Sequence, residues 1–244
     1  MSDAGAMREE RRFVTALFAD LVGSTALAER LEPEEFKLVV GDAITRIVGA
    51  VESFGGTVKD LAGDGVLALF GAPVAHEDDP ERALLAALRI TDEIEDFADE
   101  VQRSWGIEDF GVRVGVESGP VVVGAVGAGS RVEYGAMGDA LNVAARLQSH
   151  ADPGTVLVGE GTAERVEPLF EWGPQRTLDL KGKADGVGAR TVLAHTAAPA
   201  RTRGLEGIQT PVVGRERELG EIRALAEAAI AGTGAILVVS GEPG

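Results

Sequence analysis

The chain has 244 residues, 45% of them hydrophobic, which is enough for one good core and a smaller unit. Its formal charge of −17 argues against nucleic acid and anionic membranes as main partners, because both need a basic protein surface. The absence of cysteine rules out disulfides and thiolate metal sites and fits a reducing compartment. Neither a bilayer-spanning apolar run nor a secretory signal is found. We therefore expect a cytoplasmic protein with no direct contact to nucleic acid or membrane.

Apolar periodicity predicts alternating strands and helices after a polar stretch, residues 1–10, that is expected to be disordered. Prolines mark two helix starts, and Gly55-Gly56 marks a helix end. In chain order, the expected elements are a strand at Phe13–Ala19, a helix from Pro33 to Gly55, strands at Thr57–Leu61 and Val66–Phe70, a helix from Pro80 to about Val101, and a strand from Phe110 to Glu117.

This order, β-α-β-β-α-β, is that of the ferredoxin-like unit. In that topology the third strand inserts beside the first and runs antiparallel to it. The end of the first strand, at Asp20, should therefore lie next to the start of the third strand, which follows the turn Gly63-Asp64-Gly65. Carboxylate oxygens suit Mg²⁺, and free N–H groups at a helix start suit phosphate. The pattern predicts a site for nucleoside triphosphates at this sheet edge.

The second half of the chain predicts a long hairpin followed by a short helix and later strands. Asn142 and Arg146 are four residues apart on that helix, so they share a face and could reach one ligand. The expected elements are a hairpin of Val121–Gly124 and Arg131–Tyr134, a helix at Asp139–Ser149, and strands at Thr155–Val158 and Arg190–Leu193, with the turn Lys181-Gly182-Lys183 between these two strands.

The C-terminal part of the sequence has a different character. Residues 196–210 are expected to form a linker, since their start is rich in Ala, Thr, Pro and Arg. Residues 211–244 begin a new helical pattern and end in an apolar strand that runs into Gly241-Glu242-Pro243-Gly244, which resembles the first half of a P-loop. We expect this segment to be the start of an ATPase domain, cut inside the P-loop.

Four motifs in order resemble those of class III nucleotidyl cyclases, the adenylate and guanylate cyclases. They are Phe18–Thr25, Gly63-Asp64-Gly65, Gly138–Leu147 and Lys181-Gly182-Lys183. The resemblance covers residues 11–195 and implies an α+β fold (an α/β sandwich) with a ferredoxin-like core and extra C-terminal strands and helices. The segment 211–244 is similar to the start of signalling ATPases of the STAND or AAA kind.

The resemblance implies a reaction and a role for each motif residue. ATP would become 3′,5′-cyclic AMP and pyrophosphate by in-line attack of the ribose 3′-hydroxyl on the α-phosphate, in a head-to-tail homodimer. Asp20, Asp64 and the Leu21 carbonyl would hold two Mg²⁺ or Mn²⁺ ions per site. The backbone near Gly23, Ser24 and Thr25 would cradle phosphates, while Asn142, Arg146 and Lys181, supplied across the dimer, would hold the ribose, the α-phosphate and the triphosphate.

Base recognition departs from the family pattern. Members that select adenine carry a lysine four residues before the second metal aspartate, but Asp60 occupies that position here and Lys59 comes one residue earlier. They also carry an aspartate or threonine shortly after the hairpin tyrosine, where this chain has Gly135. Lys59, Asp60 and Gly135 are thus the candidate base-reading positions, and GTP stays open as a substrate.

Two other functions remain open at this level. Asp60 and Gly135 are compatible with a catalytically weak module that binds nucleotide or dimerises and regulates a C-terminal ATPase. The main activity could instead be ATP hydrolysis by the P-loop region. Asp20 alone could be a helix cap, and Asp64 alone a turn residue. Their occurrence together with Asn142 and Arg146 favours the cyclase.

Overall fold

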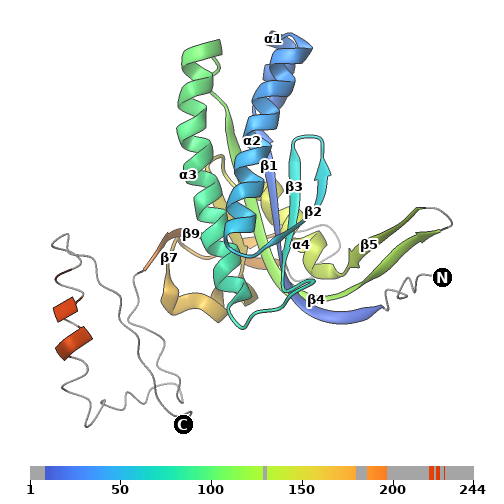
Figure 1. Cartoon of the computed structure of the whole chain (residues 1–244), viewed down its shortest axis with the longest axis vertical. Coiled ribbons are helices and arrows are strands. Elements are labelled where there is room, and N and C mark those ends of the chain that lie inside the picture. The colour runs from blue at the N-terminus through green and yellow to red at the C-terminus, as the bar shows by residue number, and fades with distance from the viewer. Residues whose placement is uncertain are drawn as a thin grey trace. The chain divides into compact units, whose positions relative to one another are not determined.

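The computed structural model describes residues 9–128, 131–179 and 186–196, together with residues 220–222, 224, 225 and 228 of a later helix (Figure 1). The chain divides into two compact units, Met1–Ala198 and Pro199–Gly244. Most of the predicted linker, the P-loop-like ending and Lys181 lie outside the described residues. The first unit carries the sheet and the predicted site, and none of its described helices is long and apolar enough to cross a membrane.

A nine-stranded mixed sheet runs through this unit, in the order β2-β3-β1-β4-β6-β9-β7, with β5 paired to β4 and β8 paired to β9. The strands are β1 (Glu10–Val22), β2 (Thr57–Ala62), β3 (Gly65–Phe70), β4 (Gly111–Ala128), β5 (Arg131–Met137), β6 (Thr155–Gly159), β7 (Phe170–Trp172), β8 (Arg176–Leu178) and β9 (Val187–His195). The helices are α1 (Ser24–Arg30), α2 (Pro33–Ser53), α3 (Asp79–Trp105), α4 (Asp139–His150), α5 (Glu160–Ala163) and the 3₁₀ helix η1 (Glu164–Leu169). The fold is α+β, as predicted.

The first four strands have the predicted ferredoxin-like arrangement. β1 lies between β3 and β4 and is antiparallel to both, while β2 pairs antiparallel with β3. β2 therefore runs parallel to β1, as the crossover through α2 requires. The remaining strands extend the sheet through the parallel pair β4–β6.

Alternation along β1 explains how both faces of the sheet are covered. Leu17, Ala19 and Leu21 belong to the core cluster formed with α2 and α3, which run side by side (Figure 1). Val14 and Ala16 belong to the cluster formed with α4 on the opposite face. Because side chains alternate along a strand, Asp20 continues the second series and lies on the face that α4 covers.

The structure corrects the prediction for β4, which is one strand and not a strand followed by a separate hairpin arm. Proline normally ends a central strand because it lacks an N–H donor, yet Pro120 lies within β4. Pro120 pairs with Phe13 of β1 on one side. On the other side β6 pairs only up to Val116 and β5 pairs only from Val122, so no strand needs the missing donor.

The other differences concern short elements and strand ends. β1 begins at Glu10, inside the stretch predicted to be disordered, because it pairs with the far part of β4. Periodicity predicts none of α5, η1, β7 and β8, because these elements have three to six residues each and are too short for a periodic signal.

Candidate active site

Asp20 and Asp64 meet at one edge of the sheet. In the β1–β3 register Asp20 is the partner of Gly65, the residue that follows Asp64. A Cβ atom built on Gly65 would lie 3.2 Å from Oδ1 of Asp20, so the Asp20 carboxylate lies directly over the turn. Gly63, with φ +65°, supplies the left-handed residue that this tight turn requires. The structure thus brings together the two carboxylates that the topology predicted to meet.

The electrostatics of Asp20 reflect this proximity. Burial raises the pKa of the Asp20 carboxyl, the negative charge of Asp64 raises it further, and the positive charge of Arg113 opposes both. Two carboxylates that share one partly buried edge repel each other and favour a bound cation. Their hard oxygens are the ligands that Mg²⁺ or Mn²⁺ prefers.

Arg113 is a functional candidate that the sequence motifs did not indicate. It is the β4 partner of Asp20, and its Nε is buried without a hydrogen-bond partner among the described residues. A buried guanidinium N–H without a partner is uncommon, since arginine donors normally find an acceptor. The signal available in the sequence was a cation that alternates with the valines of this strand, as Glu117 also does, but its position opposite Asp20 depends on the β1–β4 register.

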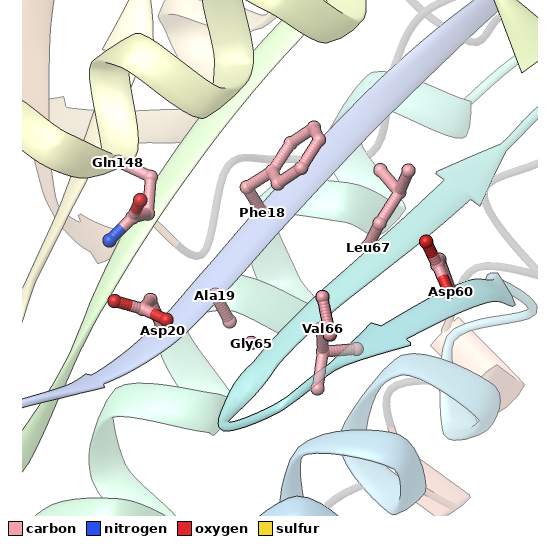
Figure 2. A pocket seen from close by; sticks show the side chains of 9 residues that line it. Phe18, Ala19, Asp20, Asp60, Gly65, Val66, Leu67 and Gln148 are labelled. Carbon is pink, nitrogen blue, oxygen red and sulfur yellow. The ribbon is translucent and has the colours of Figure 1, made fainter. Parts of the chain in front are cut away.

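A pocket of about 190 Å³ lies beside Asp20 (Figure 2). The residues that line it come from β1, β2, β3 and α4, and are Phe18, Ala19, Asp20, Asp60, Ala62, Gly65, Val66, Leu67 and Gln148. Phe18 and Leu67 supply apolar surface, whereas Asp20 and Asp60 supply carboxylates. An apolar pocket with a few polar groups is the usual form of a small-molecule site.

A β-bulge decides which of the two base-reading candidates on β2 faces this pocket. The register shifts between Val58, which pairs with Ala68, and Asp60, which pairs with Leu67. The extra residue is Lys59. Bulges of this kind re-aim side chains, and here Asp60 lines the pocket whereas Lys59 does not. Gly135, the third candidate, pairs with Gly124 on the β4–β5 arm and is not part of the pocket lining.

The segment predicted to bind phosphate forms the turn between β1 and α1. Gly23 has φ +81°, and the first bond of the helix runs from Leu27 N–H to its carbonyl. Helix geometry leaves the N–H groups of the first turn, which include those of Ser24 and Thr25, without helical acceptors. Leu21 is buried just before this turn. Free backbone N–H groups therefore follow Asp20 within a few residues of sequence.

Asn142 and Arg146 are not among the residues that line the Asp20 pocket. Both lie on α4, Asn142 exposed and Arg146 half-buried, and neither lines the pocket. The α4 residue that does line it is Gln148, which no sequence motif indicated. Of the predicted metal, ribose and phosphate side chains that the structure describes, only that of Asp20 lines this pocket within one chain.

The residues at the sheet edge fit a catalytic divalent ion better than a structural one. Among the described residues, no group of three or more His, Cys, Asp and Glu side chains is arranged to hold a metal. Mg²⁺ at phosphoryl-transfer sites commonly uses one or two carboxylates and takes its other ligands from water and substrate phosphates. Asp20 and Asp64 match that pattern.

Comparison with known proteins identifies the family. The family model described as the adenylate and guanylate cyclase catalytic domain matches residues 7–194. The chain belongs to this family. Adenylate cyclase 1 of Rhizobium meliloti (strain 1021) is 34% identical to the cyclase chain over 179 residues, which are 72% of the chain but only 27% of that relative. The chain thus spans about a quarter of that relative's length.

Solved cyclase structures share the fold of this domain. The guanylyl cyclase Cya2 superposes with a TM-score of 0.73 at 30% identity, over 78% of this chain and 95% of Cya2. The adenylyl cyclase CyaB from P. aeruginosa superposes with a TM-score of 0.74 at 24% identity, over 78% of this chain and 98% of CyaB. The cyclase fold therefore occurs in neighbours of both base specificities.

Proposed function

We propose that the chain is a Mg²⁺- or Mn²⁺-dependent purine nucleotide cyclase that converts ATP to 3′,5′-cyclic AMP and pyrophosphate, with GTP as the competing substrate. The observation that carries this proposal is the convergence of Asp20 and Asp64 beside the start of α1 and the pocket. In the reaction, the ribose 3′-oxygen bonds to the α-phosphorus and loses its proton, and the bond to the pyrophosphate oxygen breaks.

Residues of one chain at this sheet edge have separate roles in binding the metal ions and the phosphates. Asp20 and Asp64, with the Leu21 carbonyl, hold two divalent ions, which when bound supply Lewis-acid chemistry to the 3′-hydroxyl and the phosphates. The α1 N–H groups near Ser24 and Thr25 donate to the β- and γ-phosphates. Arg113 adds a fixed cation whose buried Nε has no other described acceptor, which suits a phosphate oxygen.

The remaining groups come from a second copy of the chain. Asn142 and Arg146 do not line the pocket of their own chain, which supports a head-to-tail homodimer in which they serve the other active site. There Asn142 orients the ribose, Arg146 stabilises charge at the α-phosphate, and Lys181 contacts the triphosphate. A two-fold dimer of this kind contains two identical sites.

We assign residues 11–195 to the cyclase domain, residues 196–210 to a linker and residues 211–244 to the start of a signalling ATPase domain. The first part agrees with the extent of the family match. The ATPase assignment rests on the apolar strand and the P-loop-like ending of the sequence alone. An ATPase in this position would make the cyclase a component of a larger signalling protein.

A product assay tests the proposal. The purified chain is incubated with ATP or GTP and Mg²⁺ or Mn²⁺, and cyclic nucleotides are separated by chromatography, with an Asp64→Ala variant as control. Product above the control is expected. Nucleotide binding without product in a chain shown to be dimeric would reject the enzyme and favour the regulatory module suggested by Asp60 and Gly135.

A further inference from the structure

Gln148 connects α4 to the carboxylate edge of the same chain. Among the described residues it is the one that α4 contributes to the pocket, and its side-chain amide points toward the Asp20 carboxylate (Figure 2). We infer that Gln148 is a positioning residue: when Asp20 holds a divalent ion, the Gln148 NH₂ group donates to the Asp20 carboxylate and fixes which oxygen faces the ion. The inference rests on the proposed function insofar as Asp20 is a metal ligand.

The backbone of Gln148 is held in place by a close contact with β4. A Cβ atom on Gly115 would lie 2.2 Å from the Gln148 nitrogen and 2.3 Å from the Ala144 carbonyl oxygen. Only a glycine at this position lets the helix approach so closely. Because Gly115 lies two residues after Arg113, the partner of Asp20, this contact sets the distance from Gln148 to the carboxylate edge.

The two ends of the Gln148 amide differ in chemistry. The Ser149 hydroxyl donates to the Ala145 carbonyl oxygen at 3.0 Å and lies 3.4 Å from the Gln148 Oε1, at the acceptor end of the amide. The NH₂ end carries two donors, and an ionised carboxylate such as Asp20 accepts only. The donor end of the amide therefore matches the hydrogen-bonding chemistry of the carboxylate toward which it points.

A neutral donor suits this position better than a cation. Asp20 already faces the negative charge of Asp64 and the positive charge of Arg113. A second cation would cancel the negative charge that attracts the metal, whereas an amide orients the carboxylate without changing the net charge of the site. Such supporting hydrogen bonds typically change metal affinity by about 10- to 100-fold when they are removed.

The experiment compares Gln148→Leu with wild type and with Gln102→Leu, the same chemical change at an exposed position on α3. Mn²⁺ binding is measured without nucleotide by the electron paramagnetic resonance of free Mn²⁺. Gln148→Leu should bind Mn²⁺ about 10-fold more weakly. The metal concentration for half-maximal cyclase rate should rise by a similar factor, while kcat at saturating metal and the metal-free unfolding midpoint stay close to wild type. Gln102→Leu should match wild type throughout.

Several outcomes separate this inference from the proposed function. A folded Gln148→Leu with wild-type Mn²⁺ affinity overturns the inference alone, and so does a lower kcat with unchanged metal dependence. Gln148→Met, which keeps the length of the side chain but has no donor, decides the matter if the leucine variant does not fold. If Asp20→Asn binds Mn²⁺ as tightly as wild type does, Asp20 is not a metal ligand, and the proposed function is contradicted.

Discussion

Gly115 on β4 and Gln148 on α4 lie in backbone contact, and no side chain fits between them. The same strand meets the same helix again at Gly119, where an added Cβ would lie 3.0 Å from the Ala140 side chain. Gly119 lies against Ala140 and Gly115 against Gln148, which are about two helical turns apart. The absence of side chains at both glycines therefore lets α4 pack directly on the sheet. The height of α4 above the sheet determines where Gln148, Asn142 and Arg146 stand relative to the carboxylates.

We expect Gly115→Ala to displace α4 and to reduce both stability and activity. The new methyl group would overlap backbone atoms, and overpacking of this kind typically costs about 1–3 kcal/mol. Gly119→Ala is the matched comparison, since its nearest contact is the Ala140 Cβ at 3.0 Å, so α4 would need to move by only a few tenths of an ångström. Chemical denaturation measures both variants. Equal losses for the two would contradict the special closeness of the Gly115 contact.

Asp20→Asn should abolish cyclase activity but stabilise the metal-free protein at neutral pH. The pKa of Asp20 is raised above its ordinary value of 3.8 in the folded state, so the folded protein holds this proton to higher pH than the unfolded chain does. Stability is therefore lost as pH rises through the folded-state pKa, and the ionised carboxylate disfavours folding above it. The asparagine carries no such charge.

Unfolding midpoints between about pH 5 and pH 8 in the presence of a chelator measure this effect. The advantage of Asp20→Asn should shrink as the pH falls, and Mg²⁺ should raise the midpoint of wild type only. Asp42→Asn, which removes an exposed acid from α2, serves as the control and should have no effect. A lower unfolding midpoint for Asp20→Asn than for wild type at neutral pH would show that the ionised Asp20 carboxylate does not destabilise the metal-free protein.

The meeting of Asp20 and Asp64 could be predicted because it depends only on the order of the elements. Hydrophobic periodicity identifies the order β-α-β-β-α-β, and the ferredoxin-like topology that this order indicates inserts β3 beside β1. The tight turn around Asp64 then fixes its place at the edge. No side-chain detail enters this inference, so the pattern of apolar residues and glycines was sufficient.

Arg113, Asp60 and Gln148 could not be placed in the same way. The position of Arg113 depends on the β1–β4 register, and that of Asp60 on a one-residue bulge at Lys59, which reverses the faces of the following residues. Gln148 reaches the pocket because Gly115 lets α4 approach. Each of these features arises from contacts between elements, and periodicity within one element carries no information about them.

Gly23→Ala should destabilise the turn before α1. It should also lower the cyclase rate of the protein that remains folded. Gly23 has φ +81°, and an added Cβ would lie 2.6 Å from the Asp109 carbonyl oxygen. A non-glycine residue in the left-handed region typically costs about 1–3 kcal/mol. Gly49→Ala in α2, where nothing lies within 4 Å, should stabilise the protein by about 0.5–1 kcal/mol. Thermal unfolding and initial rates measure both, and an active Gly23→Ala would argue against phosphate binding at this turn.

Asp60→Lys should raise the selectivity of the enzyme for ATP over GTP. The Asp60 carboxylate only accepts hydrogen bonds, and guanine offers it both N1–H and an amino group, whereas adenine has an acceptor at N1. Exchange of the carboxylate for an ammonium reverses this complementarity, and we expect the ratio of kcat/KM for ATP to that for GTP to rise about tenfold or more. Lys59→Ala, at the bulge itself but outside the pocket lining, should leave the ratio unchanged. An unaltered ratio in Asp60→Lys would exclude this side chain from base recognition.

A mixture of two inactive variants should recover activity if Asn142 and Arg146 serve the other subunit. Asp64→Ala removes a metal residue, and Arg146→Ala removes the residue proposed to act across the dimer. In a mixed dimer one site receives both defects and the other receives none. With random exchange of subunits about a quarter of wild-type activity should return, since half the dimers are mixed and each has one intact site.

Each variant is assayed alone and after mixing at equal concentration, with size-exclusion chromatography to confirm that dimers form. Dimers that form but stay inactive after mixing would place Arg146 and Asp64 in the same chain's site, against the proposed exchange of residues across the dimer.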